Sequence, residues 1–346
     1  RLAACFLDSI ATLGLNGEGL GLAYHFGLFR QKFEQNSQHE YPDRWHKEPD
    51  WLRRTGETFT VPLGETEVTA RLYELDVTGY EAKTTARLRL FDLETSDESL
   101  VHDGIDFDKT DLRRNLTLFL YPDDSDEQGR RLRFAQEYFL SSAAAQLIVS
   151  DMKCRGFAPQ QLDRAAVVQL NDTHPVIGIP ELMRILIDEY GYDWDTAWSI
   201  TTKTFNYTCH TLLPEALEVW PAKLISELLP RHMEIINEIN EHFLAELKTK
   251  TRDKAKIERM RIVTDEENPK VRMAYLATAG GSHVNGVAEL HSELLKDVTL
   301  RDFSDLYGDK FTNVTNGVTP RRFIRLANPR LSALITEGLG TDKWLS

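Results

Sequence analysis

The alternation of apolar and polar positions predicts a mixed region at the start of this chain. Apolar residues spaced three and four apart predict a helix over residues 2–13. Short alternating runs predict antiparallel strands, with turns at Gly64 and Gly79. The clearest of these runs are residues 59–61, 67–73 and 86–91. The glycine-rich segment 14–21 is interpreted as a turn, because no predicted strand precedes it as a dinucleotide-binding loop requires.

The remainder of the chain alternates between predicted strands and predicted helices. Strands are predicted at 116–120, 165–170 (a buried strand), 205–211, 271–277 and from 311. Helices are predicted at 136–152, 181–190, 194–201, 214–229, 231–250 and from the glycines at 280 through 295, and surface segments at 92–111 and 251–256. Strand–helix alternation after residue 165 is typical of a parallel sheet, so the predicted fold class is α/β with an additional mixed β region.

Polar residues follow three of these strands, at the point where each strand ends. Asn171, Asp172, Thr173 and His174 follow the first, His210 lies in the second, and Asn316-Gly317 follows the last. Each group has an ordinary structural interpretation as well, namely a helix cap, a hydrogen-bonded buried histidine and a turn. Ligands of open α/β sheets bind at the carboxyl ends of strands. The three groups together therefore favour a convergent site for a polyol or sugar.

Composition excludes several function classes. Acidic side chains outnumber basic ones, 54 against 41, for a formal charge of −13, which disfavours nucleic acid and anionic membranes as partners. The three cysteines (Cys5, Cys154, Cys209) form no CxxC pair, which argues against a zinc site or a disulfide framework and suits a reducing cytoplasm. The acidic segment 123–127 lacks calcium-loop spacing, and no apolar run approaches the roughly 20 residues of a membrane helix. Gly280-Gly281 allows either phosphate binding or close packing.

Four segments together resemble the α-glucan phosphorylases, which act on glycogen, starch and maltodextrin. They are residues 169–175, 179–184, 213–218 and 315–322, and the resemblance runs nearly end to end. It implies phosphorolysis of terminal α-1,4 bonds to glucose 1-phosphate, by two Rossmann-like lobes that enclose pyridoxal phosphate. We then expect residues 1–318 to form an N-terminal Rossmann-like glucan-binding lobe of a two-lobed, glycosyltransferase-type fold. Residues 319–346 would begin the connection to a C-terminal cofactor lobe that the chain lacks, together with the lysine that binds the cofactor.

The resemblance also implies roles for individual residues. His210 and Asn316 would hold the hydroxyls of the reacting glucose, and Glu218 would support His210. Asp172 and His174 would lie beside the acceptor subsite. The loop that gates this subsite would run from Tyr121 to Gly129 and include Asp124. Phe323, where many members carry Trp, would lie near the cofactor. No complete catalytic set or metal site is predicted in this chain, which we expect to be inactive alone.

Several positions depart from the family pattern. Cys209 and Ser125 stand where many members carry Asn, Ser150-Asp151 where nucleotide-regulated members carry paired arginines, and Asn237 where a storage-site aromatic is found. Allosteric control and a second glucan site are therefore in doubt. The expected partners are an α-1,4-glucan and phosphate, in a cytoplasmic homodimer without nucleic acid or membrane. A nucleotide-sugar glycosyltransferase lobe and a non-catalytic glucan-binding module remain the alternatives.

Overall fold

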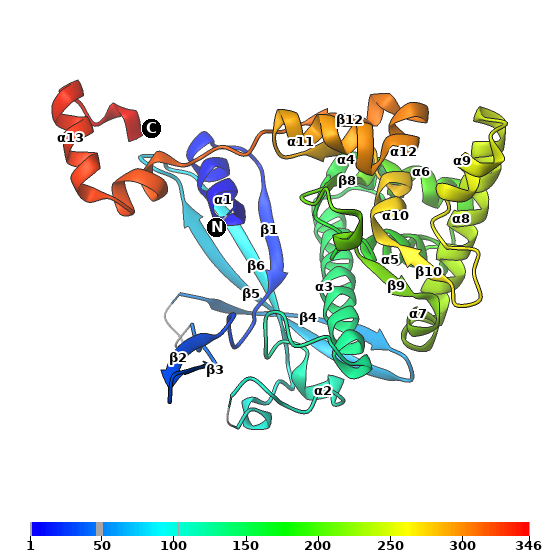
Figure 1. Ribbon diagram of the computed structural model, residues 1–346, viewed down its shortest axis with the longest axis horizontal. Coiled ribbons are helices and arrows are strands. Elements are labelled where there is room, and N and C mark those ends of the chain that lie inside the picture. Colours follow the sequence, from blue (N-terminus) through cyan, green and yellow to red (C-terminus); the bar gives the residue numbers. More distant parts are fainter. Residues whose placement is uncertain (1, 46–50, 103, 346) are drawn as a thin grey trace.

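Two four-stranded sheets, with the long helix α3 (Glu127–Cys154) between them, organise the computed structural model of this chain (Figure 1). The structure describes residues 2–45, 51–102 and 104–345. Helix α3 is buried around most of its circumference, and its buried residues include Gln136, Glu137 and Ser142 as well as apolar side chains. It begins nine residues before the predicted start at Gln136, because Asp126 accepts a hydrogen bond from the backbone of Gly129 and caps the helix at 2.6 Å.

The first sheet has the strand order β1-β6-β5-β4 and confirms the predicted antiparallel strands. Its strands are β1 (Glu18–Leu22), β4 (Arg53–Leu63), β5 (Thr66–Thr78) and β6 (Thr85–Leu93). Buried and less buried positions alternate along β5, so that one face of the strand covers the core. Gly64 adopts a φ of +61° in the turn between β4 and β5, a conformation that glycine adopts without strain.

Strand β1 corrects the interpretation of residues 14–21 as a turn. Its glycines lie in extended backbone that pairs parallel to β6, with Gly19 opposite Leu88. A Cβ on Gly19 would lie 3.1 Å from Leu88 and 3.2 Å from Leu7. The glycines therefore allow helix α1 (Leu2–Leu13) to pack closely on the sheet, which is a role the local pattern does not reveal.

The second sheet is parallel throughout, with the order β12-β11-β8-β7, and confirms the parallel sheet predicted after residue 165. Its strands are β7 (Val168–Asn171), β8 (Phe205–Thr208), β11 (Val284–Gly286) and β12 (Phe311–Asn313). Strand β7 was predicted to be buried, but it lies at the sheet edge. Leu170 is its one buried residue, and the preceding Val167 is 67% exposed.

Helices connect and cover the parallel strands. They are α4 (Leu162–Ala165), α5 (Gly178–Arg184), α6 (Trp194–Thr204), α7 (Ala222–Leu228), α8 (Pro230–Lys250), α9 (Lys254–Arg259), α10 (Met273–Gly280), α11 (Glu289–Leu294) and α12 (Arg301–Leu306). Three single-turn π-helical segments follow or replace helix ends, at Ile185–Glu189, Leu295–Thr299 and Arg321–Leu326. Helix α8 confirms its prediction, with the apolar stripe from Ile235 to Leu247 buried.

One predicted strand is wrong, and another is right only at residues 271–272. Residues 116–120 form turns with a single bridge from Phe119 to Phe26, and the side-chain amide of Gln136 donates to the carbonyls of Leu116 and Phe119 at 2.9 and 3.0 Å. A buried side chain thus binds part of the backbone that a second strand would bind in a sheet. Residues 273–277 belong to α10 instead of a strand, because short apolar runs fit either structure and here the buried positions follow helical spacing.

Two predicted helices begin later than expected, and one predicted turn is shorter. The helix predicted from 214 begins after Pro221, which cannot lie in a helix interior, and β9 (Val219–Pro221) pairs there with β10 (Lys270–Arg272). The helix predicted from Gly280 begins at Glu289, after β11. The predicted turn at 251–256 ends earlier, because α9 starts at Lys254.

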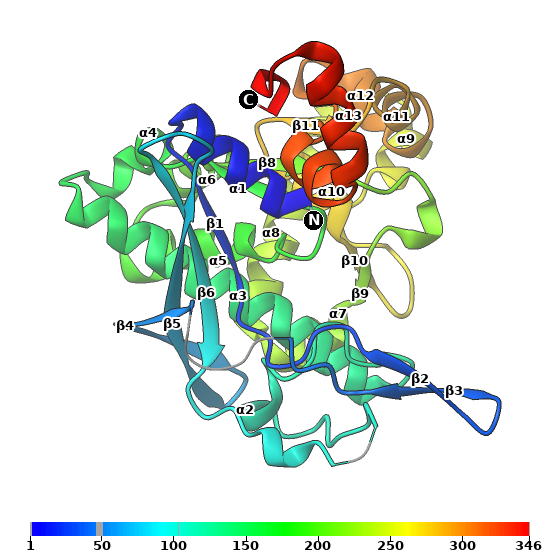
Figure 2. The same ribbon diagram turned by 90° about the vertical axis from the view of Figure 1, so that its left-hand side faces the viewer.

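Smaller elements complete the fold. The hairpin of β2 (Arg30–Glu34) and β3 (Ser37–Tyr41) projects from the molecule, and α2 (Leu112–Asn115) lies near the lower end of α3 (Figures 1 and 2). Helix α13 (Pro329–Leu339) lies near α1, where Arg321 forms an ion pair with Asp8. None of the described helices combines the length and apolarity needed to cross a bilayer.

Candidate functional site

The loop after β7 turns sharply at Asp172, which brings His174 towards helix α3. Asp172 has a φ of +68°, an uncommon conformation outside glycine that Asp tolerates better than most residues. Its backbone N–H donates to the carbonyl of Thr208 at 3.0 Å, and its carboxylate accepts from the backbone of Thr173 at 2.9 Å. Strand β8 and the local carboxylate thus determine the path of this loop.

His174 lies between two buried carboxylates from different parts of the chain. Its Nδ1 is 3.3 Å from Oε1 of Glu137, on α3, and 3.4 Å from Oε1 of Glu218, just before β9. Hydrogen bonds that His174 donates to both carboxylates raise its pKa to about 10, against the opposing effect of burial. At neutral pH His174 is therefore an imidazolium, and both of its ring nitrogens are donors.

The two carboxylates do not ionise alike. Burial, and then repulsion from Glu218, raises the pKa of Glu137 well above its ordinary range. Burial also acts to raise the pKa of Glu218, but hydrogen bonds from His174 and Glu137 lower it. Burial thus favours the neutral form of Glu137, whereas the hydrogen bonds that Glu218 accepts favour its carboxylate and those that His174 donates favour its imidazolium.

Arg133 joins this cluster to the acidic loop before α3. Its Nη2 is 3.5 Å from Glu137 and 3.8 Å from Glu218, and its Nε is 4.0 Å from Asp124. The guanidinium also lies 5.1 Å from the ring centroid of Tyr121. The Tyr121 ring is 6.5 Å from that of His174, and Tyr121 has a φ of +56°. Sequence reasoning missed both Arg133 and Glu137, although their i, i+4 spacing across the start of a helix was a usable signal.

His210 lies at the neighbouring strand end. Its Nε2 donates to the side-chain oxygen of Asn171 at 2.5 Å, and its carbonyl accepts from Nε2 of His291 at 3.2 Å. Nδ1 of His291 in turn accepts from the backbone of Val287, after β11. The carboxylate of Glu218, predicted to support His210, contacts His174 and Arg133, and Asn171 contacts His210 instead.

Asn316 follows β12 at the same edge of the sheet. Its backbone N–H donates to the carbonyl of Val287 at 3.0 Å, and the residue is exposed. Because β7, β8, β11 and β12 are parallel, the residues that follow them lie along one edge. The structure thus groups Tyr121, Asp124, His174 and Glu218 in one cluster, and aligns Asp172, His210 and Asn316 along the adjoining strand ends.

Phe323 does not join these residues. It lies in the Arg321–Leu326 segment, whose Arg321 forms an ion pair with Asp8 of α1, and 43% of its surface is exposed. The residue predicted to contact pyridoxal phosphate and those predicted to bind sugar therefore do not share a site within the described part of the chain. The residues present do not fit the cofactor, and no step is assigned to it.

Glu137, His174 and Glu218 also have the residue types of a metal site, with ligand atoms within 4.8 Å of one another. A metal requires a neutral imidazole and carboxylates free to donate. Here the raised pKa of His174 and the guanidinium of Arg133 already supply positive charge to both carboxylates. The cluster therefore fits a hydrogen-bonded ion network better than a metal centre.

The fold and this edge define a mixed α/β protein whose parallel strands end in loops rich in polar and charged side chains. The family model for carbohydrate phosphorylases matches residues 1–346, and the chain belongs to that family. It is 50% identical over 344 residues to the maltodextrin phosphorylase of Streptococcus pneumoniae, which covers 99% of this chain and 44% of that protein.

Other relatives show the same coverage. The glycogen phosphorylase of Haemophilus influenzae is 43% identical over 99% of this chain and 44% of its own length. An α-glucan phosphorylase H isozyme of Triticum aestivum is 41% identical over 100% of this chain and 45% of its own length. The chain thus spans less than half the length of the curated relatives it matches.

Proposed function

We propose that this chain forms the glucan-binding part of an α-glucan phosphorylase, which cleaves terminal α-1,4 bonds with phosphate and releases glucose 1-phosphate. Family membership over the whole chain supports the reaction class. The observation that carries the site is the alignment of Asp172, His210 and Asn316 along one edge of a parallel sheet, beside the His174 cluster. Such an edge is where α/β proteins bind ligands.

The proposal includes the architecture expected from the sequence. The parallel sheet would be the core of a Rossmann-like lobe formed by residues 1–318, and residues 319–346 would lead out of it. No residue of α13 is buried, which supports a segment that packs little against this lobe. All three cysteines are free thiols, as suits a cytoplasmic protein. The homodimer remains an expectation from the family.

His174 would act as a charged hydrogen-bond donor at the acceptor subsite. Its Nδ1 faces Glu137 and Glu218, and no described residue is hydrogen-bonded to Nε2. With 41% of its side chain exposed, the imidazolium can present Nε2 to a sugar hydroxyl. Asp172, two residues earlier in the same loop, would supply an acceptor to the same sugar. Tyr121 and Asp124 would cover this subsite from the loop before α3.

His210 and Asn316 would orient the reacting glucose. The hydrogen bond to Asn171 determines which way the His210 ring lies, and Asn316 offers an amide on exposed backbone. Neutral donors and acceptors suit glucose hydroxyls, and their contribution to rate is orientation. The described residues do not fit pyridoxal phosphate, so the proton transfers of the reaction are not assigned to this chain.

A chimera tests the proposal directly. The chain would replace the matching segment of the Streptococcus pneumoniae maltodextrin phosphorylase, and glucose 1-phosphate formation from maltoheptaose and phosphate would be measured. We expect phosphorolysis in the chimera, and its loss in the chimera that carries His210→Ala. Calorimetric titrations of the chain with maltoheptaose and UDP-glucose would separate the alternatives. UDP-glucose binding without maltoheptaose binding indicates a nucleotide-sugar enzyme, and maltoheptaose binding without phosphorolysis indicates a glucan-binding module.

A further inference from the structure

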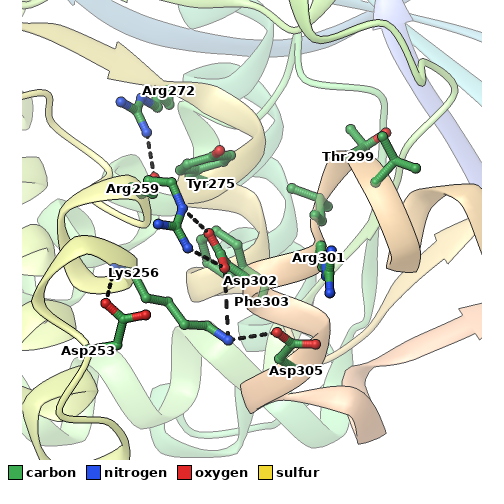
Figure 3. Close-up of a pocket in the computed structure, with 12 residues that line it drawn as sticks. Asp253, Lys256, Arg259, Arg272, Tyr275, Thr299, Arg301, Asp302, Phe303 and Asp305 are labelled. Carbon is green, nitrogen blue, oxygen red and sulfur yellow. Dashed lines mark hydrogen bonds and ion pairs between the residues drawn. The ribbon is translucent and has the colours of Figure 1, made fainter.

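A cavity of about 730 Å³ lies among α9, the start of α10 and the segment from Val298 to Asp305. None of the residues that line it belongs to the candidate sugar site. Charged side chains from these three elements point into it, and Tyr275 lies between them (Figure 3). A cavity of this size is in the range that holds a small molecule.

Two of its cations are already neutralised. Nζ of Lys256 lies 2.7 Å from Asp305 and 3.8 Å from Asp302, and Arg259 donates two hydrogen bonds to Asp302, at 2.9 and 3.0 Å (Figure 3). The carboxylate of Asp253 accepts from the backbone of Lys256 at 3.0 Å and caps α9. These contacts hold α9 against α12. Each of the three acidic residues of the cavity takes part in one of them.

Two arginines of the same cavity form no ion pair with a described carboxylate, although the pKa of Asp305, lowered first by Lys256, is lowered also by the charge of Arg301. Arg272 donates through Nη1 to the carbonyl of Arg259 at 2.7 Å, and its guanidinium lies 5.1 Å from the ring centroid of Tyr275. Arg301, the first residue of α12, is exposed and makes no side-chain hydrogen bond to a described residue. The four cations of the cavity thus exceed its three carboxylates, in a chain whose formal charge is −13.

We infer that this cavity binds the phosphoryl group of a small phosphorylated molecule, with Arg272 and Arg301 as its recognition residues. A guanidinium matches the oxygens of a phosphate with parallel hydrogen bonds, and such charge-assisted bonds are the strong ones. The contacts of Arg272 hold its guanidinium in place before a ligand arrives, which reduces the entropy lost on binding. The remaining volume and the Tyr275 ring would accommodate the organic part, so an ester fits better than free phosphate.

The 346-residue chain itself serves for the test, which does not depend on the proposed function. Calorimetric titrations would compare glucose 1-phosphate, inorganic phosphate and glucose. We expect glucose 1-phosphate to bind, inorganic phosphate to bind more weakly, and Arg301→Glu to weaken glucose 1-phosphate binding at least tenfold. Arg272→Gln should weaken it as well. Arg164→Glu, at an exposed arginine outside the cavity, is the matched control and should leave the affinity unchanged.

Hydrogen exchange would locate the ligand. Glucose 1-phosphate should slow exchange in residues 254–259 and 298–305. Arg301 is exposed, so its variant retains the fold even where Arg272→Gln disturbs the Arg259 carbonyl, and circular dichroism would verify this. Unchanged affinity in Arg301→Glu, or protection confined to residues 171–174 and 208–211, would overturn the inference. Equal affinity for inorganic phosphate would overturn the assignment of an ester.

Discussion

Two histidine–glutamate networks lie at the two ends of the His174–Arg184 segment, and they differ in whether every carboxylate oxygen has a partner. Glu181 is fully buried and accepts hydrogen bonds from His232 at 2.5 Å, Arg184 at 2.8 and 3.0 Å, and Ser142 at 2.8 Å. Burial alone would raise the pKa of Glu181, but His232 and Arg184 lower it to about 2. Every oxygen of this carboxylate has partners within the protein.

The His174 network is open by comparison. It holds two carboxylates against one histidine, and Oε2 of both Glu137 and Glu218 lacks a hydrogen-bond partner among the described residues. Glu137 has a raised pKa where Glu181 has a lowered one. A closed network stabilises a fold, whereas an open one with an exposed donor is able to bind a ligand. The same residue types thus support stability in one place and a candidate site in the other.

Removal of a carboxylate from each network should show the largest difference between them, as a difference in the loss of stability. Glu181→Ala leaves His232 buried without its carboxylate and Arg184 with Glu189 alone, so we expect the free energy of unfolding to fall by about 3–5 kcal/mol. Urea denaturation followed by circular dichroism measures it. Glu137→Gln is the control and should change stability by about 1 kcal/mol or less, because burial raises the pKa of Glu137 and so disfavours the charge that Gln lacks. Equal losses in both variants would contradict the distinction.

Ligand binding, in contrast to stability, should depend on the His174 network. His174→Ala removes a charged donor from the proposed acceptor subsite, so maltoheptaose affinity should fall roughly 10- to 100-fold, equivalent to about 1.5–3 kcal/mol. Isothermal titration calorimetry measures the change. His39→Ala, at an exposed position of β3, should leave it unchanged. A His174→Ala chain that binds as tightly as the parent would remove His174 from the site.

The two networks should also respond to pH at opposite ends of the scale. Glu181 has a pKa lowered from 4.5 to about 2, so its stabilising contribution is present above pH 4.5 and is lost as the pH falls through about 2. His174 has a pKa raised from 6.5 to about 10, so its contribution is present below pH 6.5 and is lost as the pH rises through about 10.

Unfolding titrations across the pH range check both directions. The stability difference between the parent chain and Glu181→Gln should shrink between pH 4.5 and 2, and that for His174→Gln should shrink between pH 6.5 and 10. NMR titration of the His174 ring would give its pKa directly. A ring that titrates near 6.5 would show that the carboxylates do not hold its proton.

The smallest effect concerns the orientation of His210. Asn171→Ala removes the acceptor of its Nε2 hydrogen bond, and we expect maltoheptaose binding to weaken roughly 2- to 10-fold, equivalent to about 0.5–1.5 kcal/mol. Asn171→Asp retains an acceptor and should bind nearly as well as the parent chain. Equal weakening in both variants would mean that the amide itself contacts the ligand.

Prediction from sequence succeeded where one local period decides the structure. The stripe of α8 and the alternation of β5 each cover one face of an element, so the pattern alone shows which residues are buried. It failed for residues 116–120 and 273–277, where apolar side chains fit more than one structure. The neighbouring elements decide there, since Gln136 and residues 25–26 bind the first backbone and helical packing buries the second.

The sequence by itself determined the family, the parallel sheet after residue 165 and the polar residues that follow its strands. These features depend on local chemistry and on the order of the motifs, both of which are present in the unfolded sequence. Only the tertiary structure decided that His174 lies between Glu137 and Glu218, that Asn171 orients His210, and that Arg272 and Arg301 share a cavity. Those groups come from distant segments, and their pKa values and charge balance exist only once burial and contact bring them together.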